Sequence, residues 1–405
     1  MTGARRDRSI VIVGGGIGGL TAAVALRRTG ARVHVCERSA ELAAAQAGHG
    51  LVLWHNAVLA LRAAGLGALP AAIGHELRHH QFWSYRGGRL SNWPVGEHGD
   101  RLGAPAYTVS RPALHEALCH EVGDDLELGA RCVGYEEDDG GVVVRFDDGR
   151  ELRADLLIGA DGLRSAVRAQ MRPYEPPPRY AGFTAWQGVS EVVPDGVPPH
   201  TFRGVWGRGR WFVYYRLPDG RVYWDGVIGD RVLRDMDSVG EDGRTILTRQ
   251  FGDWPDPVPA LIEATTSDRF TPVDIFDRDP VPVWSTRRAT LVGDAAHPMT
   301  FNLGQGANQA IEGAVVLASS LVTESDIDDA LRAYEAHRVD RISRMVRRSR
   351  GNGEMTRWHG ALTCRFRDLV LRAILDRIVL TKTYDLTVDP QLHDLPVPDP
   401  LEQLA

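Results

Sequence analysis

The sequence predicts an α/β fold with a parallel sheet, an interleaved antiparallel sheet and a helical C-terminal segment. Residues 9–37 have the pattern of a strand, a glycine-rich turn, a helix and a second strand. Residues 174–270 alternate aromatic and polar side chains, with little helical periodicity before Thr245. Helical periodicity returns at residues 306–321 and continues to about Leu380, with predicted interruptions at Gly351 and Gly353.

The composition is typical of a soluble globular protein. The chain has 405 residues, 43% hydrophobic and 25% charged, which excludes disordered and fibrous classes. Its net charge of -6, without a basic stripe, argues against a nucleic-acid partner. Apolar runs shorter than about 20 residues and the absence of a signal core predict no transmembrane segment and a cytoplasmic location. The four cysteines lack metal-ligand spacing, so we expect them to be buried and reduced, with no metal site.

The motif Gly14-x-Gly16-x-x-Gly19 follows the first predicted strand and opens a helix that starts at Ile17. In this position the glycines allow a tight turn, close approach of a pyrophosphate and close packing of the helix on the sheet. The helix start also offers free N–H groups and the positive end of the helix dipole. The motif therefore predicts a Rossmann-like dinucleotide site.

Glu37 ends the second strand, where a carboxylate accepts hydrogen bonds from ribose hydroxyls. A 2′-phosphate would meet this negative charge, so the pattern favours FAD or NAD over NADP, although the neighbouring Arg38 weakens the argument. The glycine motif alone does not separate FAD from NAD.

Two later strand signals end in short motifs. Residues 156–158 lead into Gly159-Ala160-Asp161-Gly162, and residues 290–292 lead into Gly293-Asp294. Parallel strands present such ends to a ligand crevice. After the second motif, Gly304 and Gly306 leave the entrance of a long apolar helix unobstructed.

These three motifs, in this order and spacing, resemble the flavin-dependent aromatic hydroxylases of the para-hydroxybenzoate hydroxylase type, which are single-component FAD monooxygenases. The resemblance covers about residues 9–350. It implies that the first motif binds the ADP half of FAD and that Asp294 hydrogen-bonds the ribityl chain. It also implies that the helix near Gly306 directs its positive end, through the N–H groups of Ala307 and Asn308, at the flavin pyrimidine edge.

Further FAD contacts follow from the same resemblance. Arg111 matches a residue that contacts FAD, and the backbones of Val52 and Cys132 match positions that touch it. Asp161 matches a residue associated with both FAD and the transient nicotinamide. The expected cofactor-binding residues are therefore Gly14, Gly16, Ile17, Gly19, Glu37, Arg38, Val52, Arg111, Cys132, Asp161, Asp294, Gly304, Gly306, Ala307 and Asn308.

The resemblance implies that NAD(P)H reduces FAD, that O2 adds at flavin C4a, and that the hydroperoxide transfers one oxygen atom to a small aromatic or polycyclic substrate. Hydroxylation is expected, with epoxidation as the alternative. Because a second dinucleotide motif is absent, NAD(P)H is expected to be a transient donor. An FAD-dependent oxidase or dehydrogenase, or a non-catalytic flavin-containing binding protein, remains an alternative. The residues do not identify a catalytic base or the oligomeric state.

The aromatic-rich region is the expected substrate region. Residues 211–217 and 221–227 flank a Pro-Asp-Gly turn and predict a hairpin, whose alternation allows only one of Tyr214 and Tyr215 to face the flavin. Phe301 lies in a loop that passes the reacting end of the flavin in similar proteins. The candidate substrate residues are Arg210, Tyr215, Trp224 and Phe301, although each aromatic could serve packing alone.

The predicted organisation is discontinuous. Residues 1–73, 101–175 and 270–350 are expected to form the FAD-binding domain. Residues 74–100 and 176–269 are expected to form the substrate-binding β-sheet domain. Residues 351–405 form the predicted C-terminal helical segment and tail.

Overall fold

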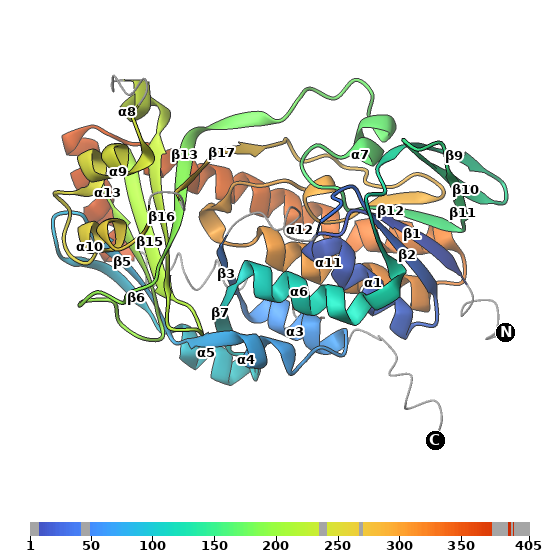
Figure 1. Ribbon diagram of the computed structural model, residues 1–405, viewed down its shortest axis with the longest axis horizontal. Coiled ribbons are helices and arrows are strands. Elements are labelled where there is room, and N and C mark those ends of the chain that lie inside the picture. Colours follow the sequence, from blue (N-terminus) through green and yellow to red (C-terminus); the bar gives the residue numbers. More distant parts are fainter. Residues whose placement is uncertain are drawn as a thin grey trace.

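A five-stranded parallel sheet forms the core of one half of the protein (Figure 1). The computed structural model describes residues 8–41, 49–234, 241–266, 270–374, 388–389 and 392. The strand order is β18-β12-β1-β2-β8. The strands are β1 (Ser9–Val13), β2 (Arg32–Glu37), β8 (Leu126–Leu128), β12 (Leu156–Gly159) and β18 (Ala289–Leu291). The predicted βαβ unit is confirmed, because β1 pairs in parallel with β2 and α1 (Ile17–Arg28) connects them.

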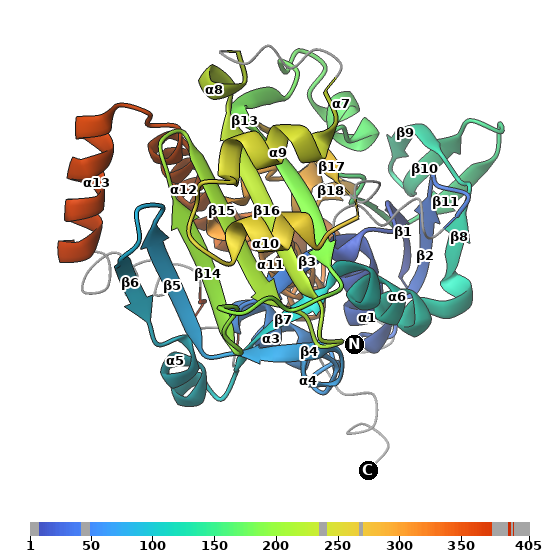
Figure 2. The same cartoon turned by 60° about the vertical axis from the view of Figure 1, so that its left-hand side comes forward.

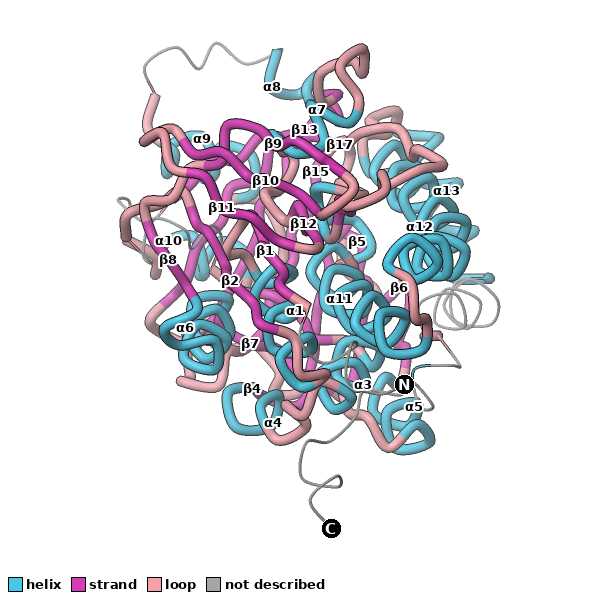
Figure 3. Tube along the Cα trace, turned by 90° about the vertical axis from the view of Figure 1, so that its right-hand side faces the viewer, coloured by secondary structure: helices cyan, strands magenta, loops and turns pink. Residues whose placement is uncertain are grey.

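The centre of this sheet is apolar on both faces, as expected for parallel strands covered on two sides. Leu157 and Ile158 are adjacent in β12 and point to opposite faces, and both are fully buried. Helices α1 and α11 (Gly306–Thr323) pack together beside the sheet, with α3 (His55–Ala63) against α11. Strands β9 (Cys132–Asp138), β10 (Gly141–Phe146) and β11 (Glu151–Ala154) form a separate antiparallel sheet near β12 and β1 (Figure 3).

A seven-stranded sheet forms the other half, in the order β17-β13-β16-β15-β14-β5-β6. The strands are β5 (His79–Ser84), β6 (Arg89–Trp93), β13 (Arg179–Ser190), β14 (Thr201–Trp206), β15 (Arg210–Arg216), β16 (Val222–Gly229) and β17 (Thr271–Asp277). The predicted hairpin is confirmed by the antiparallel pairing of β15 with β16. The sheet is not wholly antiparallel, because β14 pairs in parallel with β5.

The two faces of this sheet have different coverings. Helices α9 (Gly243–Phe251) and α10 (Val258–Glu263) lie over one face (Figure 2). Trp186, Phe212 and Trp224 pack with residues of these helices in one apolar cluster. On the opposite face, Tyr215 and Tyr223 share a cluster with Val52 and Trp54.

A small antiparallel sheet contributes to this second face, in the order β3-β7-β4. Its strands are β3 (Gly50–Leu53), β4 (Gly74–Leu77) and β7 (Ala106–Ser110). Residues 74–77 therefore pair with β7 and not with the seven-stranded sheet. The remaining short elements are α4 (Leu69–Ile73), α5 (Val95–Leu102), α6 (Arg111–Val122), α7 (Ala166–Met171), α8 (Asp230–Arg234) and the 3-10 turns η1 (Gly123–Asp125), η3 (Gly293–Ala295) and η4 (Phe301–Leu303).

The C-terminal helices differ from the predicted pattern. Helix α12 (Ile327–Thr356) runs through Gly351 and Gly353 without a break, so the predicted interruptions there are wrong. A Cβ atom at residue 353 would lie 2.9 Å from Asn302 Oδ1 and 3.1 Å from the Phe183 ring. Glycine is therefore kept at this position for close packing against η4 and β13. The chain leaves the helix at residues 357–360, before α13 (Ala361–Ile374).

In the part of the chain that the structure describes, every helix is too short or too polar to cross a membrane. All four cysteines are buried, as expected.

Candidate functional site

The three sequence motifs meet at one edge of the parallel sheet. Strands β18, β12, β1 and β2 are neighbours and run in the same direction, so their carboxyl ends lie together. The contacts between the motifs are close. A Cβ atom on Gly14 would lie 2.4 Å from the carbonyl oxygen of Ala160, and one on Gly18 would lie 3.1 Å from Cβ of Ala310 in α11.

The glycines of the first motif have different structural roles. Gly14 has φ +112°, and a Cβ on Gly19 would lie 2.0 Å from the carbonyl oxygen of Gly14, so the fold itself requires both. Gly16 is the N-cap of α1, and a Cβ there would meet nothing within 4 Å. Ile17 is the first helical residue. Gly16 therefore faces open space at the uncapped start of a helix, where an anionic group is favoured.

Glu37 lies at the end of β2, beside this loop. Its Oε2 accepts a hydrogen bond from the Gly15 N–H at 2.8 Å, and its Oε1 accepts one from the Ser39 N–H at 2.8 Å. Each carboxylate oxygen can accept a further bond, so both remain available to a ligand hydroxyl. Arg38 is exposed.

Asp161 belongs to the second motif and follows β12. Its Oδ2 accepts the N–H of Ala166 at 2.6 Å, whereas its Oδ1 is buried without a partner in the described part of the structure. Burial raises the pKa of Asp161, and hydrogen bonds from the Ser165 side chain and from backbone N–H groups oppose the rise. Cys132 is nearby at the start of β9, and burial raises the pKa of its thiol to about 11. The unsatisfied Asp161 oxygen indicates a missing donor.

Asp294 follows β18 within η3. Its side chain has accessible surface, but it lies deep within the protein, and this desolvation raises the pKa of Asp294. The positive charge of Arg111 opposes the rise. Asp294 therefore borders a space within the protein. Arg111 starts α6, and its N–H donates to the carbonyl oxygen of His49 at 3.1 Å. Its guanidinium makes no hydrogen bond or ion pair to the described residues, although Asp294 and Tyr223 act on it electrostatically.

The start of α11 is the third component. Gly304 has φ +62°, and a Cβ on Gly306 would meet nothing within 4 Å. Gln305, the N-cap, makes no side-chain capping bond within the described structure, so the N–H groups of Gly306, Ala307 and Asn308 are open to a ligand. The Asn308 side chain accepts the Trp54 N–H at 2.7 Å and donates to the Val52 carbonyl at 2.9 Å. It therefore fixes the end of β3 against this helix.

These features fit the binding of FAD. Two helix starts without side-chain caps offer N–H groups, and Gly16 and Gly306 each leave open space in front of them. Asp161 and Arg111 hold polar atoms without partners among the described residues. A dinucleotide with anionic phosphates and polar hydroxyls would satisfy both kinds of group.

A buried polar cluster lies behind the start of α11 and was not identified from the sequence. Glu312 and Arg338 are fully buried and form an ion pair. Asn56 Nδ2 donates to Glu312 Oε2 at 2.8 Å, and Arg338 Nη2 donates to Gln309 Oε1 at 2.7 Å. Gln309 Nε2 also donates to Gln305 Oε1 at 3.1 Å. The cluster joins α3, α11 and α12. Its sequence signal was the placement of Gln309 and Glu312 in a largely apolar helix.

Two further residues that hold the motifs in place were not predicted from the sequence. His115 lies on α6, and its Nε2 is 2.7 Å from the carbonyl oxygen of Gly15 in the glycine loop. Arg168 lies on α7 and donates to the carbonyl oxygens of Ala295 at 2.9 Å and Ala296 at 2.6 Å. Arg168 therefore joins the second motif to the third. Neither contact has a local sequence signal, because each links segments far apart in the chain.

The candidate substrate residues divide between the two faces of the seven-stranded sheet. Tyr215 and Phe301 belong to the cluster on the side of β3 and η4. Trp224 is fully buried on the helix-covered face and donates to Thr265 Oγ1 at 2.9 Å. Arg210 also points to that face, where it donates to the Gln250 carbonyl at 2.5 Å. The expectation that Arg210 and Trp224 contact substrate is therefore corrected, because strand alternation directs both into packing against α9 and α10.

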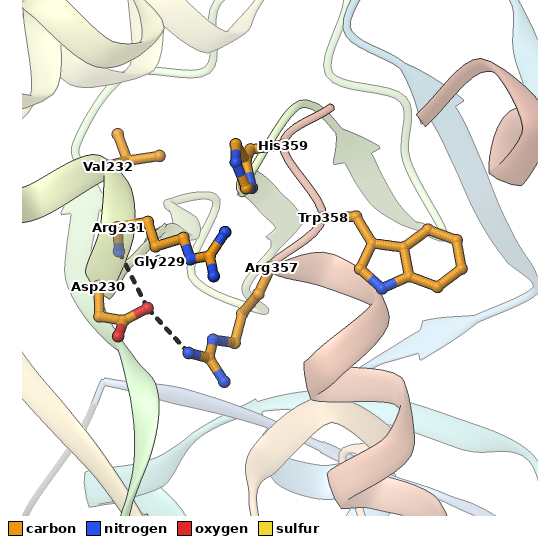
Figure 4. Close-up of a pocket in the computed structure, with 8 residues that line it drawn as sticks. Gly229, Asp230, Arg231, Val232, Arg357, Trp358 and His359 are labelled. Atoms are coloured by element: carbon orange, nitrogen blue, oxygen red, sulfur yellow. Dashed lines mark hydrogen bonds and ion pairs between the residues drawn. The ribbon is translucent and has the colours of Figure 1, made fainter. Parts of the chain in front are cut away.

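A separate pocket of about 290 Å³ lies at the other end of the sheet (Figure 4). Gly209, Gly229, residues of α8 and residues 357–359, which follow α12, line it. Arg357 Nη2 forms an ion pair with Asp230 Oδ1 at 2.9 Å across its wall. The three motifs contribute no residue to this pocket.

One group of side chains has the composition of a metal site. The ligand atoms of His34, Cys36 and Glu127 lie within 4.8 Å of one another. However, Glu127 forms an ion pair with Arg150 at 2.7 Å, and burial raises the pKa of the Cys36 thiol to about 12. The protonated thiol and the competing cation disfavour metal binding.

Comparison with known proteins gives the same assignment. The sequence model of the FAD binding domain family matches residues 7–200 and 261–349. The aurachin C monooxygenase/isomerase of Stigmatella aurantiaca is 42% identical over 365 residues, covering 90% of this chain and 94% of that protein. The 3-amino-4-hydroxybenzoate 2-monooxygenase of Streptomyces cremeus is 35% identical over 401 residues, covering 96% and 98%.

A solved structure has the same fold over nearly the whole chain. The crystal structure of Klebsiella pneumoniae HpxO complexed with FAD and uric acid superposes with a TM-score of 0.86 at 29% identity. The match covers 96% of this chain and 98% of that one.

Proposed function

This chain belongs to the single-component FAD-dependent aromatic hydroxylases, and we propose that it is an NAD(P)H- and O2-dependent monooxygenase that hydroxylates a small aromatic or polycyclic substrate. The observation that carries the proposal is the meeting of all three motifs beside an aromatic-lined sheet face. FAD is its cofactor.

The residues at the edge of the parallel sheet would hold the cofactor. The free N–H groups at Gly16 and Ile17 would bind the pyrophosphate, and Glu37 would accept bonds from the ribose. Asp294 would bind the ribityl chain, with Arg111, Asp161, Val52 and Cys132 beside the cofactor. Burial of these groups in a space enclosed by protein would exclude water from the reacting end.

When bound, FAD accepts a hydride from NAD(P)H and activates O2, which allows transfer of one oxygen atom to the substrate. The N–H groups of Gly306, Ala307 and Asn308 would stabilise negative charge on the reduced ring. The cluster of Glu312 and Arg338 would keep these donors in place, since it joins α11 to α12.

The sheet face beside this site would bind the substrate. Tyr215 lies 4.9 Å from Tyr223 and 5.6 Å from Phe202, measured between ring centroids. Phe301 contacts Trp211 at 5.6 Å from the neighbouring turn η4. Flat aromatic walls favour a flat aromatic ligand.

The domain division is proposed on the same basis. Residues up to 77, 101–175 and 278–350 would form the FAD-binding domain, and residues 176–277 with β5 and β6 would form the substrate domain. The expected boundary at residue 270 is moved because β17 pairs with β13 in the seven-stranded sheet. The pairing of β4 with β7 supports a boundary after Leu77. A cytoplasmic location remains a prediction.

The proposal is tested by a ligand screen on the purified flavoprotein. Aurachin C, uric acid and 3-amino-4-hydroxybenzoate are natural first probes, because similar enzymes carry these names. We expect one aromatic class to stimulate NAD(P)H consumption and to yield a product that is one oxygen atom heavier and labelled from ¹⁸O2. Flavin turnover that leaves no label in the product would contradict the proposal and favour an oxidase or dehydrogenase.

A further inference from the structure

Asp225 is a buried carboxyl group outside the cofactor motifs, and one of its two oxygens has no partner in the described structure. It lies in the middle of β16, and its side chain is 7% exposed. Its Oδ1 makes no hydrogen bond within the described chain. A buried carboxylate oxygen without a donor is costly, so its retention calls for a ligand.

Strand alternation places Asp225 on the face that carries Tyr215 and Phe301. Its neighbours Trp224 and Gly226 point to the helix-covered face, where a Cβ on Gly226 would lie 3.1 Å from the Phe251 ring. Tyr223 and Val227, two residues away on either side, belong to the cluster that includes Phe301. Asp225 therefore points toward the proposed substrate face.

The sheet face around Asp225 is incompletely covered although its strands are internal. Asp225 is paired with Gln187 on β13 and with Val213 on β15. Both partners are partly accessible, whereas inner strands with a packed face are normally buried. The sheet face next to Asp225 is therefore less completely covered than the centre of a packed sheet, although Oδ1 itself is buried.

We infer that Asp225 is the residue that accepts a hydrogen bond, and then the proton, from an acidic O–H or N–H group of an aromatic substrate. In this step the substrate O–H or N–H bond breaks, the proton moves to Asp225 Oδ1, and the electron pair stays on the substrate atom. The ring gains electron density, which favours attack on an electrophilic oxygen. This inference rests on the proposed function.

The titratable neighbours of Asp225 are consistent with this role. Burial raises the pKa of Asp225 to about 7, while side-chain hydrogen bonds from Tyr223 and Gln187 to its carboxyl group favour the ionised form. Burial also raises the pKa values of Tyr215 and Tyr223 well above the usual range, so both stay protonated. Arg111 acts on Tyr223 from α6. The acceptor is therefore mainly ionised only above about pH 7.

The test compares two probes that differ in one hydrogen-bond donor. 2-Naphthol carries an O–H group, and 2-methoxynaphthalene has the same rings without it. Equilibrium dialysis against the FAD-loaded enzyme measures both dissociation constants at pH 6 and pH 8, independently of turnover. The variant is Asp225→Asn, and Asp219→Asn makes the same chemical change in the exposed turn of the same hairpin.

At pH 8 we expect Asp225→Asn to weaken 2-naphthol binding at least about tenfold, the scale of a hydrogen bond to a charged group. The loss should shrink at pH 6, and 2-methoxynaphthalene should bind both proteins equally. Asp219→Asn should match the wild type throughout. Equal weakening of both probes, no weakening of either, or no binding of 2-naphthol to the wild type would each overturn the inference. Selective 2-naphthol binding without ¹⁸O in any product would refute only the proposed function.

Discussion

The buried ion pair between Glu312 and Arg338 allows a quantitative test of how α11 is positioned. We consider Arg338→Met, which keeps the aliphatic length of the side chain and removes its charge. Both residues are fully buried. The substitution leaves the Glu312 carboxylate with Asn56 Nδ2 at 2.8 Å, Gln309 Nε2 at 3.2 Å and Arg341 Nη2 at 3.4 Å.

Removing one partner of a buried pair costs roughly 3–5 kcal/mol, because the other charge stays buried. Because three donors to Glu312 remain, we expect the loss of unfolding free energy to lie near the lower end of this range, at about 3 kcal/mol. Adding Glu312→Gln removes the stranded charge, so the double variant should be less destabilised than Arg338→Met alone. The two substitutions should therefore be strongly non-additive.

The assay is urea unfolding with FAD in excess, followed by circular dichroism, together with the FAD dissociation constant. Arg347→Met, at an exposed position of the same helix, is the control and should change the unfolding free energy by less than about 0.5 kcal/mol. A loss below about 1 kcal/mol in Arg338→Met, or a double variant that is no more stable than the single one, would refute this reasoning.

The other predictions concern cofactor binding and pH. Gly16→Ala should weaken FAD binding roughly tenfold or more while leaving the unfolding of the FAD-free protein unchanged. Gly19→Ala should abolish soluble protein, because its Cβ would lie 2.0 Å from the Gly14 carbonyl oxygen. Equal effects of the two substitutions would disprove the different roles of these glycines. Asp294→Ala should lower FAD affinity about tenfold by fluorescence titration, and unchanged affinity would contradict the ribityl contact. Burial lowers the pKa of His297 from 6.5 to about 3, so below pH 6.5 the histidine binds a proton when the protein unfolds. Its contribution to the free energy of unfolding should therefore fall by about 1.4 kcal/mol per pH unit below 6.5. In urea titrations from pH 7 to 4, the free energy of unfolding should decline less steeply for His297→Gln than for the wild type.

Most of the elements that the sequence predicted correctly have a local sequence pattern. The predicted helix at residues 17–28 and the strand at 9–13 agree with α1 and β1, and the hairpin around Asp219 agrees with β15 and β16. These elements are set by short-range rules of periodicity and turn chemistry, which a single sequence displays. The interruption predicted at Gly351 and Gly353 failed for the opposite reason. At Gly353, packing against η4 outweighs the low helix propensity of glycine.

The strand pattern alone could not show which side of the seven-stranded sheet faces the site. Alternation showed that Tyr214 and Tyr215 must point to opposite sides, but it could not show which side α9 and α10 would cover. Trp224 and Arg210 were therefore assigned to the substrate, although they pack under those helices. The same ambiguity hid Asp225, which follows Trp224 and points the other way.

The sequence by itself determined the first βαβ unit, the glycine loop and the three motifs, because each depends on residues close together in the chain. Only the tertiary structure decided which polar groups meet, such as Arg168 with the turn after β18 and Arg338 with Glu312. It also decided which face of the second sheet stays open. The Arg168 contact depends on the packing of segments more than 100 residues apart, and the Arg338–Glu312 pair depends on the packing of two neighbouring helices. In both places, burial makes an unpaired polar group too costly.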